Sequence, residues 1–576
     1  MSWLPFGELP PHTARRFIPV TVDLGDPAAV LRCFDQLEAA LTRVGSVAEL
    51  EAWLIDAGEL RAALEEEKAR RYIAMTCHTD DAVAEKAYLD LVEQMDPATK
   101  PRYFRLSQLF LTHPLRSQLP PDRYGVYDRN TALKVELYRE ENVALETEDE
   151  RLQQQYQKLI GAQTVQHEGQ EKTLVQMGRL QEEPDRSVRE AAWRLVATRR
   201  QQDAETCETL FDHLLELRQR QARNAGFENY RDYAFKLRAR FDYGPPECIA
   251  FHHAIADEVV PLLRRLQSRR RVQLGVPSLR PWDLAVDPLN RPPLRPFADA
   301  AELEEKSQRI FDRLNPDLAA DFQTLRQARL LDLSNRKGKA PGGYQYTLSE
   351  ARVPFIFMNA VGLQRDVETL LHEAGHAFHA LAARDEPLEA YRDAPIEFCE
   401  VASMAMELLA APHLEEFYSP ADAARARTMH LEGVVDVFPW IATIDAFQHW
   451  LYTHPGHSRA ERHGAWLELR ARFGGDVDWS GLEDSQTILW HKQAHLFLNP
   501  FYYIEYGIAQ MGALQVWANS RRDRVGSLRA YRGALSLGGS RPLPELFAAA
   551  GCRFDFSAAA LHPLVELLNA ELFSAS

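Results

Sequence analysis

The sequence predicts a mostly α-helical protein that contains a small β-sheet. Over most of the 576 residues, apolar side chains recur at spacings of three and four, which is the period of an amphipathic helix. Strand-like runs are confined to two short places, around Gly169 and between Leu330 and Asn359. Hydrophobic residues make up 45% of the chain and charged residues 26%, as in an ordinary globular protein, and the length allows more than one domain.

The N-terminal part of the chain is expected to form a series of helices. Apolar periodicity predicts helices over residues 28–44, 47–76, 79–94, 133–159 and 185–225. No heptad pattern persists along them, so we expect paired antiparallel helices rather than a long coiled coil. Strand-like runs at 164–166 and 173–177, on either side of Gly169, predict a hairpin. We place a loose domain boundary near residue 190, between an N-terminal helical lobe (1–190) and the remaining region (191–576).

The larger sheet is expected in the middle of the chain. A proline-rich loop over residues 277–296 precedes it, and the strands follow between Leu330 and Asn359. The apolar run 355–358 suits a buried strand. Three glycines permit tight turns in this segment: Gly338, Gly342 and Gly343. The segment lacks the phosphate-loop pattern, so it does not predict nucleotide binding.

Charge and cysteine content exclude several kinds of partner. The formal net charge of -16 argues against nucleic acid or an anionic membrane. No stretch approaches the roughly 18 consecutive apolar residues of a membrane span, and Met1–Val20 lacks the apolar core of a secretion signal. The six cysteines show no C-x-x-C spacing, which indicates neither a disulfide framework nor a thiolate metal site. We therefore expect a cytoplasmic, reduced protein.

The most informative stretch is the pentapeptide that runs from His372 to His376. The apolar residues around it keep the helical period, with Asp366 as the expected N-cap. One helical turn separates the two histidines, about 6 Å along the axis, so both imidazoles can bind one metal ion. Glu373 lies about 100° around the helix, where it can hold a water molecule rather than the metal. The spacing is typical of zinc hydrolases, although two surface histidines and a solvated glutamate would give the same pattern.

A hydrolytic zinc site needs a third protein ligand and leaves the fourth position to water. His379 lies about 10.5 Å along the axis from the first histidine, which is too far to share the ion, so we expect it to pack beneath the site. In the next predicted helix, 394–409, the residues Glu400, Ser403 and Glu407 form a polar line that needs partners if it is buried. We predict Glu400 as the third ligand and Glu407 as the hydrogen-bond acceptor of a ligand imidazole. The alternative is that both carboxylates are solvated.

Five blocks occur in a fixed order between about residues 330 and 510: 337–344, 354–359, 372–379, 400–407 and 495–507. Together they resemble the thimet oligopeptidase and oligoendopeptidase F family of zinc peptidases. The resemblance implies a mostly α, two-lobed helical peptidase with a deep central channel, one zinc ion and a small β-sheet next to the zinc-binding helix. Residues 191–576 would then be the catalytic region. The resemblance also supports Glu400 as ligand, and it implies substrate-binding roles for Gly343, Asn359 and Tyr503.

Catalysis by such a site follows from its parts. Zinc activates water and polarises the peptide carbonyl, while Glu373 takes the water proton as general base and delivers it to the leaving amine. The developing oxyanion needs further donors. In the family, a histidine and tyrosines of the last block contact the transition state, which implies this role for His495, Tyr502 and Tyr506. These tyrosines are expected at helical spacing, and their alternative role is aromatic core packing. Which of them stabilises the oxyanion is left open.

The sequence thus predicts a zinc-dependent oligoendopeptidase that hydrolyses internal bonds of short peptides. A metallo-exopeptidase could use the same ligand set, and a peptide-binding scaffold with a degenerate motif would be non-catalytic. The intact set of His372, Glu373, His376 and Glu400 argues against the scaffold. We also expect an edge strand leading into the metal helix to pair with an extended substrate; the alternative is an internal strand with no free edge. The sequence predicts neither the oligomeric state nor the physiological substrate.

Overall fold

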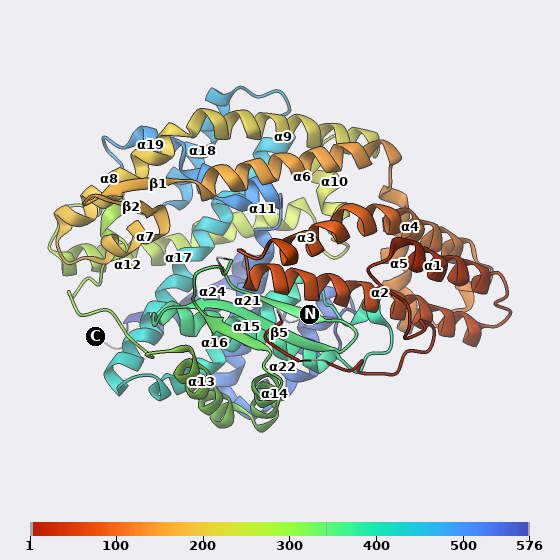
Figure 1. The fold of residues 1–576 in the computed structure, drawn as a ribbon. Coiled ribbons are helices and arrows are strands. Elements are labelled where there is room, and N and C mark those ends of the chain that lie inside the picture. Colours follow the sequence, from red (N-terminus) through yellow and green to blue (C-terminus); the bar gives the residue numbers. More distant parts are fainter. Residues whose placement is uncertain (1–3, 8, 341, 574–576) are drawn as a thin grey trace. The chain divides into compact units, whose positions relative to one another are not determined.

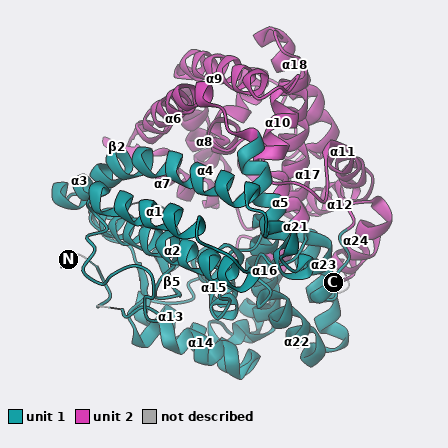
Figure 2. Ribbon diagram, turned by 90° about the vertical axis from the view of Figure 1, so that its right-hand side faces the viewer, with its two compact units in different colours: residues 1–136, 294–427, 509–554 teal, residues 137–293, 428–508, 555–576 magenta. Residues whose placement is uncertain are grey.

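The computed structural model describes residues 4–7, 9–340 and 342–573, so Pro341 of the glycine-rich segment lies outside the described residues. The fold is mostly α-helical with two small sheets, which confirms the predicted fold class (Figure 1). The chain divides into two compact units, and each is built from three segments (Figure 2). Unit 1 comprises Met1–Glu136, Leu294–Arg427 and Ala509–Phe554, and unit 2 comprises Leu137–Pro293, Thr428–Ile508 and Asp555–Ser576.

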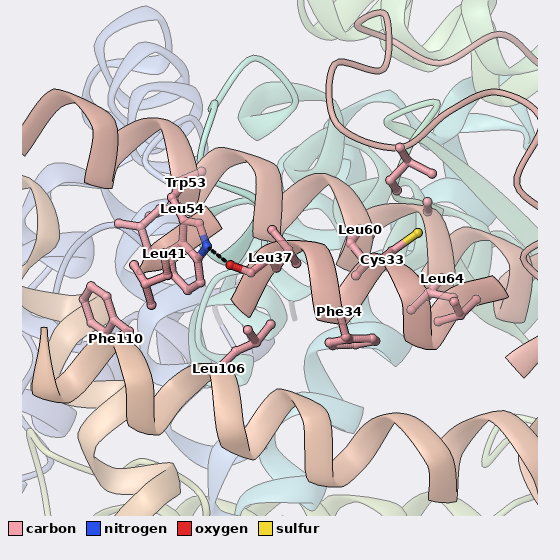
Figure 3. Close-up of a cluster of buried hydrophobic side chains, with 14 of the residues drawn as sticks. Cys33, Phe34, Leu37, Leu41, Trp53, Leu54, Leu60, Leu64, Leu106 and Phe110 are labelled. Carbon is pink, nitrogen blue, oxygen red and sulfur yellow. Dashed lines mark hydrogen bonds between the residues drawn. The ribbon is translucent and has the colours of Figure 1, made fainter. Parts of the chain in front are cut away.

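The first segment of unit 1 is a group of helices around its own apolar core. Its helices are α1 (Pro27–Leu41), α2 (Val47–Cys77), α3 (Ala82–Asp90), α4 (Asp96–Thr112) and α5 (Pro121–Leu137). Asp26, Ser46 and Asp81 accept hydrogen bonds from backbone N–H groups at the starts of α1, α2 and α3, which explains where these helices begin. In the core, the Trp53 indole N–H donates to the Leu37 carbonyl oxygen at 2.9 Å, so its polar atom is satisfied among apolar neighbours (Figure 3).

The second segment of unit 1 holds the larger sheet, with strands β3 (Leu331–Ser334), β4 (Tyr344–Leu348) and β5 (Val353–Ala360). The strand order is β3-β5-β4; β5 runs parallel to β3 and antiparallel to β4. The strand that leads into the next helix is therefore the middle one, and the expectation that it lies at an edge is wrong. The edge strands of this sheet are β3 and β4.

The helices of unit 1 that follow and flank this sheet complete its core. They are α13 (Ala300–Leu314), α14 (Pro316–Gln327), α15 (Gln364–Ala383), α16 (Ile396–Ala410), α22 (Arg524–Leu535) and α23 (Leu543–Ala549). Asp366 is the third residue of α15 rather than its N-cap, and its carboxylate accepts from the backbone N–H groups of Val361 and Leu363. It thereby satisfies donors that lie before the helix.

Unit 2 is helical apart from a short hairpin. Its elements up to residue 293 are α6 (Glu140–Gly161), β1 (Thr164–His167), β2 (Gln170–Thr173), α7 (Leu174–Gly178), α8 (Arg186–Gln202), α9 (Ala204–Asn224), α10 (Tyr230–Leu237), α11 (Pro245–Ala254) and α12 (Val260–Leu274). The later helices, two of which begin or end in unit 1, are α17 (Pro420–Thr453), α18 (Arg459–Phe473), α19 (Glu483–Thr487), α20 (Ala494–Leu498), α21 (Ile504–Arg522) and α24 (Ala558–Phe573).

Three predicted elements of this region have different bounds. The helix predicted at 133–159 is the end of α5 and the start of α6, because Arg139 is extended. The helix predicted at 185–225 is broken at Asp203. The second strand of the hairpin ends at Thr173, because this side chain forms a capping box with Gln176 and starts α7.

Two further expectations concern the cysteines and membrane-spanning segments. All six cysteines lie in the described part and are free thiols. None of the helices in the described ranges combines the length and the apolar character that a bilayer-spanning segment requires.

Candidate active site

Helix α15 carries the two histidines of the pentapeptide on one face. Their rings lie 4.9 Å apart between centroids, nearly perpendicular to each other. The opposite side of the helix is fixed in the core of unit 1 by buried apolar residues, among them Leu370, Leu371 and Phe378. Because the helix is held by this apolar side, the face with His372 and His376 has a fixed direction.

A close helix–helix approach brings the third predicted ligand to these histidines. A Cβ atom added at Gly375 would lie 2.5 Å from the Ser403 Cα and 2.6 Å from the Ala402 carbonyl oxygen of α16. Only a residue without a side chain fits there. At this approach, Glu400 Oε2 lies 3.4 Å from His372 Nε2 and 3.8 Å from His376 Nε2.

The three side chains have the donor types and spacing that a zinc ion requires. One ligand atom of each lies within 4.8 Å of the others. Tetrahedral zinc bonds of about 2.1 Å place neighbouring ligand atoms about 3.4 Å apart, which is close to the two distances from Glu400 Oε2 to the histidines. Two imidazoles and one carboxylate from two helices therefore fit one zinc ion and leave a fourth position.

Further hydrogen bonds hold these side chains in place. His372 Nδ1 lies 2.7 Å from Glu407 Oε1, which directs its Nε2 toward Glu400. The Ser403 hydroxyl lies 3.1 Å from Glu400 Oε2 and donates to this carboxylate. The polar line predicted on α16 is thus a set of partnered groups rather than a solvated face. Such partners orient metal ligands and make imidazoles more basic.

Glu373 lies beside the ligand pair and is only 8% exposed. Burial raises the pKa of its carboxyl group to about 7, although the charge of His372 and a hydrogen bond from the Gln345 backbone oppose this shift. Gln345 belongs to β4, so the carboxyl group lies next to one of the two edge strands of the sheet. A carboxyl group with a pKa near neutrality can exchange a proton at physiological pH.

The histidines of α15 differ in their proton affinity. Burial lowers the pKa of His372, but hydrogen bonds with Glu400 and Glu407 outweigh this effect and raise it well above its ordinary value. Burial lowers the pKa of His376 to about 4 and that of His379 to about 3. His379 packs its ring against Phe398, 5.9 Å between centroids. It is a buried neutral ring on the same helix, as its spacing predicts.

The aromatic block near residue 500 forms a cluster in unit 2. The ring of His495 lies 4.9 Å from that of Tyr503, 5.6 Å from Tyr502 and 5.9 Å from Tyr506. Gln493 bridges His495 Nδ1, at 2.8 Å, and the indole N–H of Trp440, at 2.9 Å. The expectation of helical spacing is wrong for two of the tyrosines, because α21 begins only at Ile504. The cluster nevertheless gathers the three predicted tyrosines around the imidazole of His495.

Gly343 and Asn359 lie together on the sheet of unit 1. The Asn359 amide nitrogen donates to the carbonyl oxygens of Ala340 and Gly342, at 2.7 and 2.9 Å, and so fixes the glycine-rich segment before β4. A Cβ atom at Gly343 would lie 3.3 Å from the Phe357 carbonyl oxygen. These contacts shape the loop that leads into β4, and substrate binding by either residue stays a prediction.

Two features of this region were missed by the sequence reasoning. The close approach at Gly375 depends on another helix, and only a small residue inside the pentapeptide could have signalled it. The Tyr531 hydroxyl donates to the Ala402 carbonyl oxygen at 2.7 Å, the same carbonyl that faces Gly375. Tyr531 comes from α22, far along the chain, and no sequence pattern marks it.

Comparison with known proteins adds independent support for the family. The sequence profile of peptidase family M3 matches residues 179–565. The oligoendopeptidase F homolog of Lactococcus lactis subsp. lactis (strain IL1403) is 23% identical over 228 residues, which cover 40% of this chain and 37% of that protein. The chain thus matches little more than a third of this relative's length.

Two solved structures are similar over nearly the full length. An X-ray structure of a protein provisionally named oligoendopeptidase F is 28% identical, with a TM-score of 0.88 and coverage of 97% of this chain and 99% of that chain. PZ peptidase A, solved with an inhibitor, is 27% identical, with the same TM-score and the same coverage of both chains. The family profile covers more than half of the sequence, and the resemblance seen in the motifs is confirmed: the chain belongs to peptidase family M3.

Proposed function

We propose that the protein is a zinc-dependent oligoendopeptidase that hydrolyses internal bonds of short peptides. The observation that carries the proposal is the donor set of His372, His376 and Glu400, with the buried carboxyl group of Glu373 beside it. The names of the relatives, oligoendopeptidase F and PZ peptidase A, support a peptidase that acts within short chains. We further propose a cytoplasmic location, which fits the six free thiols.

Each of these residues would have a separate role in the reaction. His372, His376 and Glu400 would hold one zinc ion, and Glu407 would keep His372 oriented through its Nδ1. Bound zinc supplies Lewis acidity, which activates water and polarises the scissile carbonyl. Glu373 would accept the proton of the attacking water on its carboxylate and return it to the leaving amine. Its pKa of about 7 suits both directions of transfer.

The substrate would be held by backbone pairing and by the aromatic cluster. β4 has a free edge among the described strands, and an extended peptide can add to such an edge through main-chain hydrogen bonds. We propose for His495, Tyr502 and Tyr506 the role that the family resemblance implies, as donors to the developing oxyanion. Tyr503, whose pKa is raised to about 12 by burial, remains a neutral phenol and is proposed to contact the substrate.

The test is cleavage of a library of internally quenched peptides whose two ends are chemically blocked. We expect cleavage that stops on addition of a chelator and returns with zinc. Cleavage of only those peptides that have a free end would show an exopeptidase. Binding of the peptides without any cleavage, in a zinc-loaded protein, would show a scaffold. Either of these two results would refute the proposal.

A further inference from the structure

A second group of side chains that could bind a metal lies in unit 2. It is carried by helices α11 and α17, which are labelled in Figure 1. Cys248 and His252 are one turn apart on α11, and Asp445 and His449 are one turn apart on α17, so each pair shares one helix face. One ligand atom each of Cys248, Asp445 and His449 lie within 4.8 Å of one another. All four side chains are buried, with exposed fractions of 7% or less.

The hydrogen bonds of this group leave several polar atoms unused. His252 Nε2 lies 2.8 Å from Asp445 Oδ2 and bonds to it. The other carboxylate oxygen, Oδ1, has no hydrogen bond to any residue in the described ranges. His449 Nε2 lies 3.4 Å from Asp445 Oδ2, at the long limit of a hydrogen bond, and His449 Nδ1 has no hydrogen-bond partner within the described part of the chain. Buried polar atoms without partners are rare and destabilising, which points to a ligand among them.

The chemistry of the group suits a divalent metal ion. Thiolate, imidazole and carboxylate are the usual ligands of zinc, and they also bind cobalt. A dication would balance one thiolate and one carboxylate, so the buried group would carry no net charge. The rings of Phe235 and Phe501 lie 5.8 and 5.6 Å from the ring of His449, between centroids. Such an apolar environment is typical of a structural site rather than a substrate-accessible one.

We propose that Cys248, Asp445 and His449 bind a second metal ion of the zinc type, and that His252 positions Asp445 through its hydrogen bond. On binding, the Cys248 thiol loses its proton to solvent and its sulfur coordinates the ion as a thiolate. The ion would join α11 to α17 inside unit 2. The site is independent of the donor set on α15 and α16, and it adds a structural metal to the proposed peptidase.

The first test uses cobalt, because a thiolate ligand gives Co²⁺ a charge-transfer band in the near ultraviolet. His372, His376 and Glu400 include no thiol, so the band reports on the second site alone. The full-length protein is stripped of metal and reloaded with Co²⁺. We expect the band in the wild type and in a His372→Ala/His376→Ala variant. Absence of the band in the cobalt-loaded wild type would overturn the proposal without the use of any variant.

Cysteine variants then identify which thiol gives rise to the charge-transfer band. It should be lost in Cys248→Ser and retained in Cys207→Ser, which replaces another buried thiol of unit 2. It should also be retained in Cys399→Ser, whose thiol is adjacent in sequence to Glu400. Loss of the band in the Cys399 variant, or its survival in the Cys248 variant, would contradict the assignment. If Cys248→Ser does not fold, the Cys399 and Cys207 variants still decide, because the band must survive in both.

The second test counts metal by mass spectrometry. We expect about two ions per chain in the zinc-loaded wild type and about one in the His372→Ala/His376→Ala variant. A His449→Gln variant should also hold about one ion and should keep peptidase activity. About one ion in the wild type and none in the His372→Ala/His376→Ala variant would show a single site. That result would refute the second site while leaving the proposed peptidase intact.

Discussion

Glu373 can be tested separately from the metal ligands, because its side chain is proposed to move a proton and not to hold the ion. Glu373→Gln keeps the size of the side chain but cannot accept the water proton. We expect kcat to fall by about 10²–10⁴-fold, the usual contribution of general acid–base catalysis. Peptide hydrolysis and zinc content are measured on the same preparation. Full activity in a variant that retains zinc would disprove the role of Glu373 as base.

Glu407 touches a proposed ligand, and its replacement should act on the metal. Glu407→Ala removes the acceptor 2.7 Å from His372 Nδ1. Loss of such a partner lowers metal affinity by about 10–100-fold, so we expect a drop of that size. The measurement is competition for zinc with a coloured chelator. Glu415→Ala, which changes an exposed carboxylate in the 3-10 helix Ala411–Glu416 that follows α16, serves as the control and should bind zinc as the wild type does.

At the scale of residues, the sequence predicts what depends on spacing within one helix. The one-turn separation of His372 and His376 and the polar line through Glu400 and Glu407 could be read directly, because helix geometry fixes which residues share a face. Contacts between distant segments could not be predicted in this way. The group around Asp445 was missed because 193 residues separate it from His252, and its ligands are spaced by one helical turn instead of the C-x-x-C pattern.

The crossing of α15 and α16 can be tested at Gly375. In Gly375→Ala the added methyl group would meet the Ser403 Cα and the Ala402 carbonyl oxygen, which are backbone atoms with little freedom to move. Such overpacking costs about 1–3 kcal/mol of unfolding free energy, and the shift should also separate Glu400 from the histidines. We expect weaker zinc binding together with lower stability in urea.

A second glycine provides the control. Gly433 lies within α17, and nothing lies within 4 Å of an added Cβ atom there. Gly433→Ala should therefore stabilise the protein by about 0.4–1 kcal/mol and leave zinc binding unchanged. Equal effects of the two substitutions would contradict the close approach at Gly375.

Glu208 joins three elements of unit 2 and predicts a dependence of stability on pH. It accepts from Arg462 Nη1 at 2.5 Å and lies 2.7 and 3.0 Å from the Nε2 atoms of His463 and His491. Burial alone would raise the pKa of Glu208, but these partners hold it well below its ordinary value of 4.5. The unfolded chain therefore takes up the proton at a higher pH than the folded one. The stabilisation is present above pH 4.5 and is lost as the pH falls further.

Glu208→Gln removes this titration. At pH 7 we expect it to lower the unfolding free energy by about 1.5–3 kcal/mol, because it removes one charged acceptor of the buried Arg462, which keeps its other ion pair with Asp212. The gap between variant and wild type should narrow as the pH falls below 4.5. Urea unfolding at a series of pH values measures it. Glu205→Gln, at an exposed pair with Arg459, should have little effect. A gap that stays constant down the pH series would contradict the assignment.

At the scale of elements, long apolar patterns predicted the existence of helices better than their ends. The N-terminal helices begin where Asp26 and Ser46 provide caps. By contrast, Thr173 reads as a strand residue because it is β-branched, but its hydroxyl starts α7. The order of the strands also could not be predicted from the sequence. β5 pairs with both other strands, and nothing in its own sequence indicates that it lies in the middle of the sheet.

For the whole molecule, removal of metal should lower the local stability at the two proposed metal sites. A chelator removes the proposed metal ions, which bind only the folded protein. The helices whose side chains would bind these ions therefore lose stability. Amide hydrogen exchange should accelerate in α15 and α16 of unit 1 and in α11 and α17 of unit 2. The apolar core of α1, α2 and α4, which contains no proposed ligand, serves as the internal control. Uniform acceleration along the chain would argue against localised sites.

The division of the chain is the least predictable property at this scale. Each unit combines three separated segments, whereas a boundary read from sequence assumes a single linker, predicted near residue 190. That boundary stays a prediction. Composition offers no break at the points where the chain passes from one unit to the other, because continuous helices such as α17 and α21 carry it across.

This division has a consequence for synthesis on the ribosome. Unit 1 includes residues 509–554 and unit 2 includes residues 555–576, so neither unit has all its parts until translation has passed those segments. A nascent chain released earlier would present α15 and α16 without α22, whose Tyr531 hydroxyl caps the Ala402 carbonyl oxygen at their crossing. The proposed metal site thereby acquires this contact only after the ribosome has passed α22.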